Sequence, residues 1–341
     1  MISLREAFDA VLKGRSLEAA EAESVFGEIL DDVAPEALVA GFLVAIRLKG
    51  ETAAELAGGV RAMRRRARPL NLDDGRVLDT AGTGGDGAGT FNISTGAAIV
   101  AAAAGVATAK HGNRAASGRV GAADLLERCG VRLELDPAGL HQCLARARIC
   151  FVFAPAYHPV LARLAVFRRA LGIRTIFNLM APLANPARPR YQLLGVAEPW
   201  LLQPMAEALA ALEVEHALVV HGHDGLDEIS LGAPTSVIEL RRGALEAYQI
   251  TPEDFGIGAA SAAEFLVADV GDAAEVLRRA LGGAPGPARD VLALNAGAAI
   301  YAGQGAPSLA AGVRLADQVL ASGRALDTIE QLRLASQQPT V

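Results

Sequence analysis

The spacing of apolar residues along the chain changes near residue 70. Over residues 1–68 the apolar positions recur every three or four residues, which is the period of amphipathic helices. One such stripe consists of Leu38, Phe42, Leu43 and Ile46. Thr52 with Glu55 fits the capping box that begins a helix. We therefore predict a bundle of short helices for this part of the chain.

Beyond that point, short apolar or β-branched runs alternate with helical stretches. The predicted strands cover residues 76–79, 106–110, 150–154, 192–196, 216–220 and 235–241. The predicted helices cover residues 92–104, 120–129, 137–147 and 200–212, with two more in 308–337. Alternation of strands with helices is typical of a parallel sheet that carries helices on both faces.

These patterns predict an α/β fold with two domains. The small α-helical domain consists of residues 1–70 and about 160–190, where the pattern turns helical again. The large α/β domain, with a mostly parallel central sheet, consists of residues 71–159 and about 191–341. Ligands of such sheets bind at the carboxyl ends of the strands, so we expect the polar segments that follow the strands to converge there.

The composition is that of a globular protein. The chain has 341 residues, 52% of them hydrophobic, so it can bury a large core and is not disordered. Its formal net charge of -6 argues against broad electrostatic binding to nucleic acid. Three cysteines without metal-ligand spacing indicate reduced thiols in a cytoplasmic protein. The N-terminus reads as an amphipathic helix rather than a secretory signal, and we expect no membrane partner.

The segment after the first predicted strand has the residues of a phosphate-binding loop. Its glycines are Gly82, Gly84, Gly85 and Gly87. Glycines permit positive φ angles and let backbone N–H groups approach a ligand closely. The next helix, beginning near Asn92 or Ser94, would present its N-terminus to an anion. The spacing matches neither the Walker loop nor the dinucleotide fingerprint. A glycine-rich connection without a ligand is the alternative, and the polar run 110–114 argues against it.

Adjacent carboxylates follow the predicted strand 216–220. Asp227 and Glu228 suit Mg²⁺, which prefers oxygen ligands and often joins one or two carboxylates to substrate phosphates. Asp86 and Ser94 are further candidate ligands for the same or a second ion. A solvated acidic pair is the alternative, and the convergence of polar loops favours the metal site.

Two other polar groups each have two interpretations. His221 and His223 have a spacing that zinc sites use, but no further Cys or His stands near them, so we interpret them as polar loop residues. The arginine run 61–68 is either a set of cations at a helix C-terminus or a nucleic-acid patch, and the acidic net charge favours the helix end. Arg168, on a predicted helix, is a candidate for bidentate binding of a carboxylate, and a solvated arginine is the alternative.

Several motifs in fixed order resemble those of the anthranilate phosphoribosyltransferase family. They are G-T-G-G-D-G at 82–87, F-N-I-S-T at 91–95, K-H-G-N-R at 110–114, Y-H-P at 157–159, R-T-I-F-N at 174–178 and D-E at 227–228. The resemblance extends from the first helices to residue 330. It implies a small α-helical domain, a large α/β domain related to the nucleoside phosphorylases, and a homodimer formed through the helical domain.

The resemblance also implies the reaction. The family transfers the phosphoribosyl group of 5-phosphoribosyl-1-diphosphate to the amino group of anthranilate, with release of diphosphate, on the pathway to tryptophan. Mg²⁺ is the implied cofactor, as two ions in each active site. The aromatic amine is already nucleophilic, so positioning rather than a strong general base is expected to supply much of the rate. The alternatives are a related phosphoribosyltransferase or nucleoside phosphorylase with another acceptor, and a nucleic-acid-binding paralogue.

The matching positions imply roles for individual residues. The implied donor-binding residues are Gly82, Thr83, Gly85, Asp86, Thr90, Asn92, Ser94, Thr95 and Lys110. The implied acceptor-binding residues are Gly82, His111, Asn113, Tyr157, His158 and Arg168. The implied metal ligands are Ser94, Asp227 and Glu228. Lys110 and Asn113 are the residues implied to stabilise the transition state. No residue is implied as a general acid or base.

Some positions depart from the family pattern, in the segments 116–119 and 121–123 and, with the most weight, at Ala181. Ala181 stands where the family usually has a glycine near the aromatic acceptor. A methyl group there would narrow the acceptor pocket, or would be strained if the position required a positive φ. The departure bears on the identity of the acceptor rather than on that of the donor.

Overall fold

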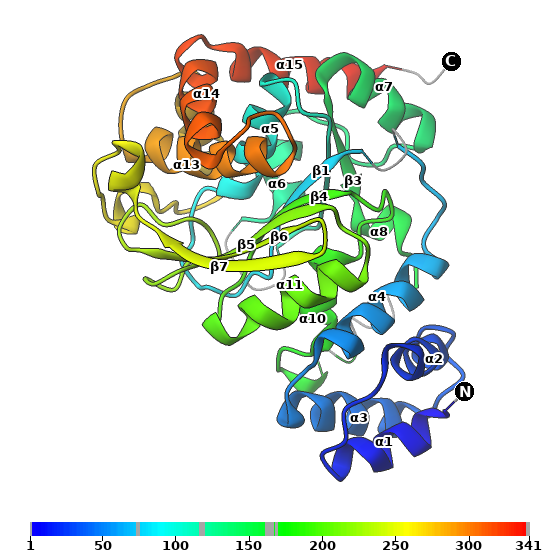
Figure 1. The fold of residues 1–341 in the computed structure, drawn as a ribbon. Helices are drawn as coiled ribbons and strands as arrows, with labels where there is room; N and C mark the ends of the chain where they lie inside the picture. The colour runs from blue at the N-terminus through cyan, green and yellow to red at the C-terminus, as the bar shows by residue number, and fades with distance from the viewer. Residues whose placement is uncertain (1, 73–75, 116–119, 161–166, 168–169, 339–341) are drawn as a thin grey trace.

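The computed structural model describes residues 2–72, 76–115, 120–160, 167 and 170–338. A small helical part lies beside a larger part built on a sheet (Figure 1). The small part begins with four helices, α1 (Leu4–Leu12), α2 (Ala19–Leu30), α3 (Glu36–Lys49) and α4 (Ala53–Arg66). A short helix from much later in the chain, α10 (Ile176–Met180), joins them. The small α-helical and large α/β parts confirm the predicted fold class.

The helical part is held by its caps and by an aromatic core. The Thr52 hydroxyl accepts from Glu55 N at 3.4 Å, and Glu55 Oε2 accepts from Thr52 N at 2.9 Å, which is the predicted capping box. Phe26 of α2 packs edge-on against Phe42 of α3 and against Phe177 of α10. The aromatic contact with Phe177 ties the later segment into the bundle.

The larger part contains a 7-stranded sheet in the order β3-β2-β1-β4-β5-β6-β7. Its strands are β1 (Leu78–Gly82), β2 (Thr108–Gly112), β3 (Ile149–Phe153), β4 (Tyr191–Gly195), β5 (His216–Gly222), β6 (Thr235–Arg241) and β7 (Ala244–Ile250). Strands β1 to β5 pair in parallel, while β6 and β7 are antiparallel additions at one edge. The sheet is therefore mostly parallel, as predicted.

Helices cover both faces of the sheet. One face carries α5 (Ile93–Ala103), α6 (Ala122–Arg128), α7 (Pro137–Ala147), α12 (Val270–Leu281), α13 (Pro287–Ala302), α14 (Leu309–Ala321) and α15 (Arg324–Gln337). The other face carries α11 (Leu202–Ala211), which packs on α4 and so joins the sheet to the helical part. Alternate residues of β5 divide between the two cores, since Leu218 belongs to one and Val219 to the other.

Short elements complete the fold. They are α8 (Ala154–Tyr157) and the 3₁₀ helices η2 (Ala181–Leu183), η3 (Pro199–Leu201), η4 (Pro252–Phe255) and η5 (Ala262–Phe265). In the described part of the chain no helix is long and apolar enough to cross a membrane.

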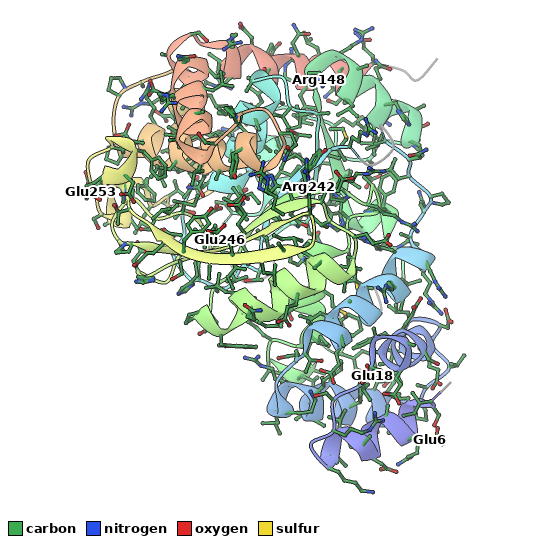
Figure 2. The ribbon with its side chains drawn as sticks, viewed as in Figure 1. Glu6, Glu18, Arg148, Arg242, Glu246 and Glu253 are labelled. Carbon is green, nitrogen blue, oxygen red and sulfur yellow. The ribbon has the colours of Figure 1, made fainter. Side chains whose placement is uncertain are left out.

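Strand β7, at one edge of the sheet, was not predicted from the sequence pattern. Arg242 and Gly243, both with positive φ, form the tight turn between β6 and β7. Arg242 and Glu246 are exposed there (Figure 2). Charged side chains on an edge strand discourage pairing with a second sheet. The edge is therefore protected against pairing.

Candidate active site

Polar segments from separate strands meet at the carboxyl edge of the sheet. The backbone N–H of Gly84, in the loop after β1, donates to Asp227 Oδ2 at 2.7 Å. The backbone N–H of Ser94, in the first turn of α5, donates to Glu228 Oε1 at 3.0 Å. Because Asp227 and Glu228 follow β5, the glycine loop, the start of α5 and the acidic pair form one site.

Two glycines permit this close approach. A Cβ atom on Gly82 would overlap the Asp227 carboxylate, and one on Gly195 would overlap the Asp227 carbonyl. Gly82 and Gly195 end the neighbouring strands β1 and β4 and are paired in register. The lack of side chains at both positions therefore lets the acidic loop lie directly on the strand ends.

Lys110, in the middle of β2, is buried and interacts with the charge of Glu228. Its Nζ donates to Thr80 O at 2.6 Å and to Ser94 Oγ at 3.2 Å. Burial lowers the pKa of Lys110, while the negative charges of Asp79 and Glu228 act in the opposite direction. The ammonium is thus a buried cation that holds the start of α5 and interacts with two buried carboxylates.

Asp79, in β1, connects this network to two further segments of the chain. Its Oδ1 accepts from His111 N at 3.0 Å, and its Oδ2 accepts from Asn185 Nδ2 at 2.9 Å. Asn185 also donates to Ala109 O at 2.8 Å. Burial raises the pKa of Asp79 to about 6, although the charge of Lys110 opposes the shift. These bonds join β1, β2 and the segment after η2 into a rigid base for the site.

The acidic pair carries more negative charge than its surroundings neutralise. Burial, followed by the charge of Asp86, raises the pKa of Asp227 to about 7. Burial, followed by the charge of Asp227, raises the pKa of Glu228 well above its ordinary value. A cation beside the pair would reverse both effects.

The donor set at this point fits Mg²⁺. Asp227, Glu228 and the Ser94 hydroxyl offer oxygen atoms, which this ion prefers. No cluster of three or more His, Cys, Asp or Glu side chains in metal-binding geometry occurs among the described residues. Two carboxylates nevertheless suffice for an ion that takes its remaining ligands from substrate phosphates and water.

The remaining donor-side residues surround the start of α5. Asn92 caps the helix with φ 65°, in the left-handed region, and its side-chain oxygen accepts from the Thr95 hydroxyl. Thr83 N donates to Gly195 O at 2.9 Å, which fixes the start of the glycine loop to the end of β4. Thr90, at the end of the loop, forms an isolated bridge with Leu266. The structure therefore gathers the predicted donor residues around one loop and one helix start.

The predicted acceptor residues are only partly brought together. The rings of His111 and His158 lie 5.4 Å apart, and burial lowers the pKa of His158 to about 4 and that of His111 well below its ordinary value. His111 Nε2 and His158 Nδ1 are buried and have no hydrogen-bond partner among the described residues. The hydroxyl of Tyr157 instead donates to Leu135 O at 3.1 Å, away from the site. Asn113 is exposed.

Comparison with known proteins identifies the family. Residues 5–67 match the helical bundle domain of the glycosyl transferase family, and residues 74–326 match its a/b domain. The anthranilate phosphoribosyltransferase of Chloroflexus aggregans is 49% identical over 97% of this chain and 98% of the relative. The chain belongs to the anthranilate phosphoribosyltransferase family.

Solved structures of this family superpose over nearly the whole chain. That of the Thermus thermophilus anthranilate phosphoribosyltransferase has a TM-score of 0.92 and 44% identity, with coverage of 97% of this chain and 99% of the other. The Saccharomyces cerevisiae family member in complex with PRPP and Mg has a TM-score of 0.88 and 26% identity, with coverage of 98% and 97%. That yeast protein has also been solved in complex with 4-fluoroanthranilate.

Ala181 is accommodated without backbone strain. Its φ of -53° and ψ of -50° are those of a right-handed helix, so the expectation that the position could require a positive φ is wrong. At this position, the volume of the methyl group is what could still affect the acceptor pocket. Arg168, the predicted carboxylate partner, lies outside the described residues.

Several residues of the site were not predicted from the sequence. Arg174, just before α10, donates to the carbonyls of Thr83 and Gly84. Asn185 binds Asp79, and Gly195 makes room for the acidic loop. The sequence signals were present, since Arg174 lies in the R-T-I-F-N motif, but their partners are far away along the chain.

The alternative zinc and nucleic-acid sites are not supported. His221 Nδ1 lies 2.8 Å from Val196 O, and His223 Nε2 lies 2.8 Å from Ser236 Oγ, so both are engaged locally. In the arginine run, the partners are Ala211 O for Arg61, Leu183 O for Arg64, Glu23 for Arg65 and Asp31 for Arg66. These arginines end α4 and join it to its neighbours, as expected for a helix C-terminus.

We expect the raised pKa of Asp227 to make the metal-free protein less stable as the pH rises. The folded state binds this proton more tightly than the unfolded state, so the stabilisation is complete below the ordinary pKa of 3.8 and is lost as the pH rises through about 7. Urea unfolding of the wild type and of Asp227→Asn, without metal, isolates the effect. The stability of the wild type relative to the variant should fall between pH 4 and pH 7 and then level off; a constant difference would contradict the assignment.

Proposed function

We propose that this chain transfers the phosphoribosyl group of 5-phosphoribosyl-1-diphosphate to the amino group of anthranilate, in tryptophan biosynthesis. The products are N-(5-phosphoribosyl)anthranilate and diphosphate. One observation carries the proposal: the backbone N–H groups of Gly84 and Ser94 are bonded to Asp227 and Glu228, so a glycine loop, a helix start and an acidic pair share one site. Family membership supports the choice of substrates.

In this proposal the diphosphate and ribose of the donor lie against the glycine loop and the start of α5. Backbone N–H groups at a glycine-rich turn and at a helix start bind phosphate well. The proposed donor-binding residues are the ones named from the sequence. Lys110 contributes through its charge, which interacts with Glu228. The buried ammonium offsets negative charge at the site without itself being exposed, since Lys110 is only 2% exposed.

Asp227 and Glu228 would hold Mg²⁺, with the Ser94 hydroxyl as a further ligand. Bound there, the metal would offset the negative charge that develops on the departing diphosphate. The raised pKa values of the two carboxyl groups support a cation at this place. Two ions in each active site are proposed, with Asp86 close enough to the pair to influence both pKa values.

The acceptor amine would reach the sugar from the side of His111, His158 and the exposed Asn113. The lowered pKa values of His111 and His158 keep both side chains neutral near pH 7, so this side of the site carries little charge. A neutral aromatic amine needs no strong base, and its orientation supplies much of the rate. Lys110 and Asn113 are proposed to support the transition state.

The activity is tested with purified protein, 5-phosphoribosyl-1-diphosphate and Mg²⁺. Anthranilate fluorescence should fall only in the complete mixture, and not when the donor, the metal or the protein is omitted. Other aromatic amines, purine bases and pyrimidine bases, offered in the same assay with diphosphate release as the readout, test the acceptor. Turnover of another acceptor in preference to anthranilate would overturn the proposal. The methyl group of Ala181 would then be the first candidate for the altered acceptor specificity.

Arg168 is proposed to bind the anthranilate carboxylate. We expect Arg168→Ala to raise the KM for anthranilate about tenfold or more, because a bidentate charged contact contributes about 1.5–3 kcal/mol. The KM for the donor should stay within about twofold of the wild-type value. Steady-state kinetics with each substrate varied in turn provide the measurement, and unchanged use of anthranilate would remove Arg168 from the site.

A homodimer and a cytoplasmic location complete the proposal. Large apolar side chains of the helical part are exposed, which supports association through that part; they include Leu12, Val33 and Leu48. Cys129, Cys143 and Cys150 are free thiols, as expected in a reducing compartment.

A further inference from the structure

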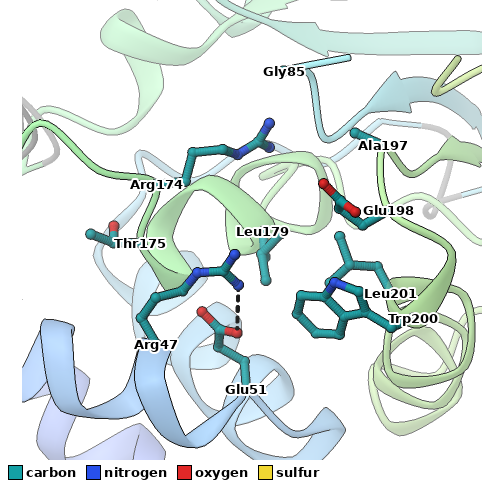
Figure 3. Close-up of a pocket in the computed structure, with 10 residues that line it drawn as sticks. All are labelled: Arg47, Glu51, Gly85, Arg174, Thr175, Leu179, Ala197, Glu198, Trp200 and Leu201. Carbon is teal, nitrogen blue, oxygen red and sulfur yellow. Dashed lines mark hydrogen bonds and ion pairs between the residues drawn. The ribbon is translucent and has the colours of Figure 1, made fainter. Parts of the chain in front are cut away.

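Arg174 connects the helical part to the glycine loop. It precedes α10, whose Phe177 is buried in the core of the helical part against Phe26. From there the side chain extends toward the loop at Gly85, at the edge of a pocket of about 70 Å³ (Figure 3). Its guanidinium donates to Thr83 O at 2.8 Å and also to Gly84 O. The loop is therefore bonded to a side chain anchored in the other part of the molecule.

The peptide group between Thr83 and Gly84 is held at both ends. Its carbonyl accepts from Arg174 at 2.8 Å, and its N–H donates to Asp227 Oδ2 at 2.7 Å. A trans peptide is planar, with its C=O and N–H pointing in opposite directions. Fixing the carbonyl therefore fixes the direction of the N–H. A cation on the carbonyl side also polarises the peptide and strengthens the N–H as a donor.

The loop sequence leaves space for this arginine. Gly85 has a φ of +83°, and a Cβ atom there would overlap the Arg174 guanidinium. Gly84, with a φ of +65°, also lies in the left-handed region. Any other residue at position 85 would displace the side chain that holds the loop.

We propose that Arg174 is a positioning residue for donor binding. It holds the carbonyls of Thr83 and Gly84 so that the loop N–H groups face Asp227 and the diphosphate of the donor. It also couples the conformation of this loop to the position of the helical part through α10. The inference rests on the proposed binding of the donor at the glycine loop.

The kinetic test uses Arg174→Gln and Arg174→Lys. We expect Arg174→Gln to raise the KM for the donor about tenfold, since two charge-assisted hydrogen bonds are lost, while the KM for anthranilate changes less than about twofold. Arg174→Lys keeps the charge but not the two-pronged geometry, so it should fall between Arg174→Gln and the wild type. Arg47→Gln is the matched control, because Arg47 lines the same pocket but pairs with Glu51 at 3.3 Å. It should leave both KM values unchanged.

A second measurement does not depend on turnover. Amide hydrogen exchange of residues 83–88, without substrates, should be faster in Arg174→Gln than in the wild type, while exchange in β4 should be unchanged. Unchanged loop exchange, or an equal rise in both KM values, would overturn the inference. If the wild type itself does not use the donor, the proposed function is wrong. The hydrogen-exchange experiment still tests whether Arg174 stabilises the loop conformation.

Discussion

Replacing Asp227 and Glu228 together by Asn and Gln is expected to lower kcat/KM about 10³-fold or more at saturating Mg²⁺. The pair offers the buried carboxylates at the glycine loop, next to the N–H groups of Gly84 and Ser94. Loss of one well-placed electrostatic partner commonly costs 10²–10³ in rate, or about 3–4 kcal/mol, and this change removes two charges. Steady-state kinetics over a range of Mg²⁺ concentrations measure the effect.

The same double variant should not be less stable than the wild type without metal. Burial raises the pKa of both carboxyl groups, so neutral amides of similar shape relieve an unfavourable charge, while Lys110 keeps the carboxylate of Asp79 as a charged partner. Mg²⁺ should raise the Tm of the wild type but not that of the variant, because only a folded state that binds the ion gains stability from it.

Asp224→Asn is the matched control for this experiment. Asp224 lies in the same segment after β5, but its Oδ2 accepts a hydrogen bond from Ser230 Oγ at 2.6 Å and so stabilises the loop between β5 and β6. We expect this variant to keep both its turnover and its response to Mg²⁺. Mg²⁺-dependent turnover in the double variant at the wild-type level would show that the metal is held elsewhere.

Strands β3 and β5 were the most predictable parallel strands, because each is largely a short apolar run. Burial on both faces produces such runs, as in β5, where every residue is buried. The edge strand β7 was not predicted, because most of its residues are exposed and its apolar pattern is weak. Helix α13 was not predicted either, since it is buried all round from Val291 to Ala302 and lacks the one-sided stripe of an amphipathic helix.

The donor side of the site was predictable from the position of residues relative to strands. Gly82 ends β1, Lys110 lies within β2 and the acidic pair follows β5, so their convergence follows from the topology of the sheet. Asn185 and Arg174 could not be placed in this way, because their partners are set by tertiary packing. Asn185 binds Asp79 across 106 residues of sequence, and Arg174 binds Gly84 across 90. The partner of the Tyr157 hydroxyl, Leu135 O, could not be placed from the sequence for the same reason.

Lys110→Met is expected to lower kcat/KM about 10²–10³-fold and to destabilise the fold in a pH-dependent way. The methionine fills a similar volume but removes the charge that opposes the buried carboxylates of Asp79 and Glu228. Removing one partner of a buried charged pair typically costs about 3–5 kcal/mol. Without the lysine, the pKa of Asp79 should rise further above its present value of about 6.

The sign of the pH dependence follows from that shift. A carboxyl group with a raised pKa stabilises the folded state while protonated, and this stabilisation is lost as the pH rises through the folded pKa. The destabilisation of Lys110→Met relative to the wild type should therefore be small near pH 5 and larger near pH 8. Urea unfolding at several pH values, beside kinetics at pH 8, separates the structural role from the catalytic one.

Lys49→Met distinguishes a role in the site from the general cost of removing a buried lysine. Lys49 forms a buried ion pair with Glu55 at 3.0 Å, in the helical part and far from the glycine loop in sequence. Both variants should lose stability, but only Lys110→Met should lose turnover among the molecules that remain folded. Equal losses of kcat/KM would mean that Lys110 acts through the fold alone. A large loss of kcat/KM in Lys110→Met alone would mean that the charge of Lys110 contributes to phosphoribosyl transfer. The contact that allows this is the hydrogen bond from its ammonium to Ser94 Oγ, at the start of α5, at 3.2 Å.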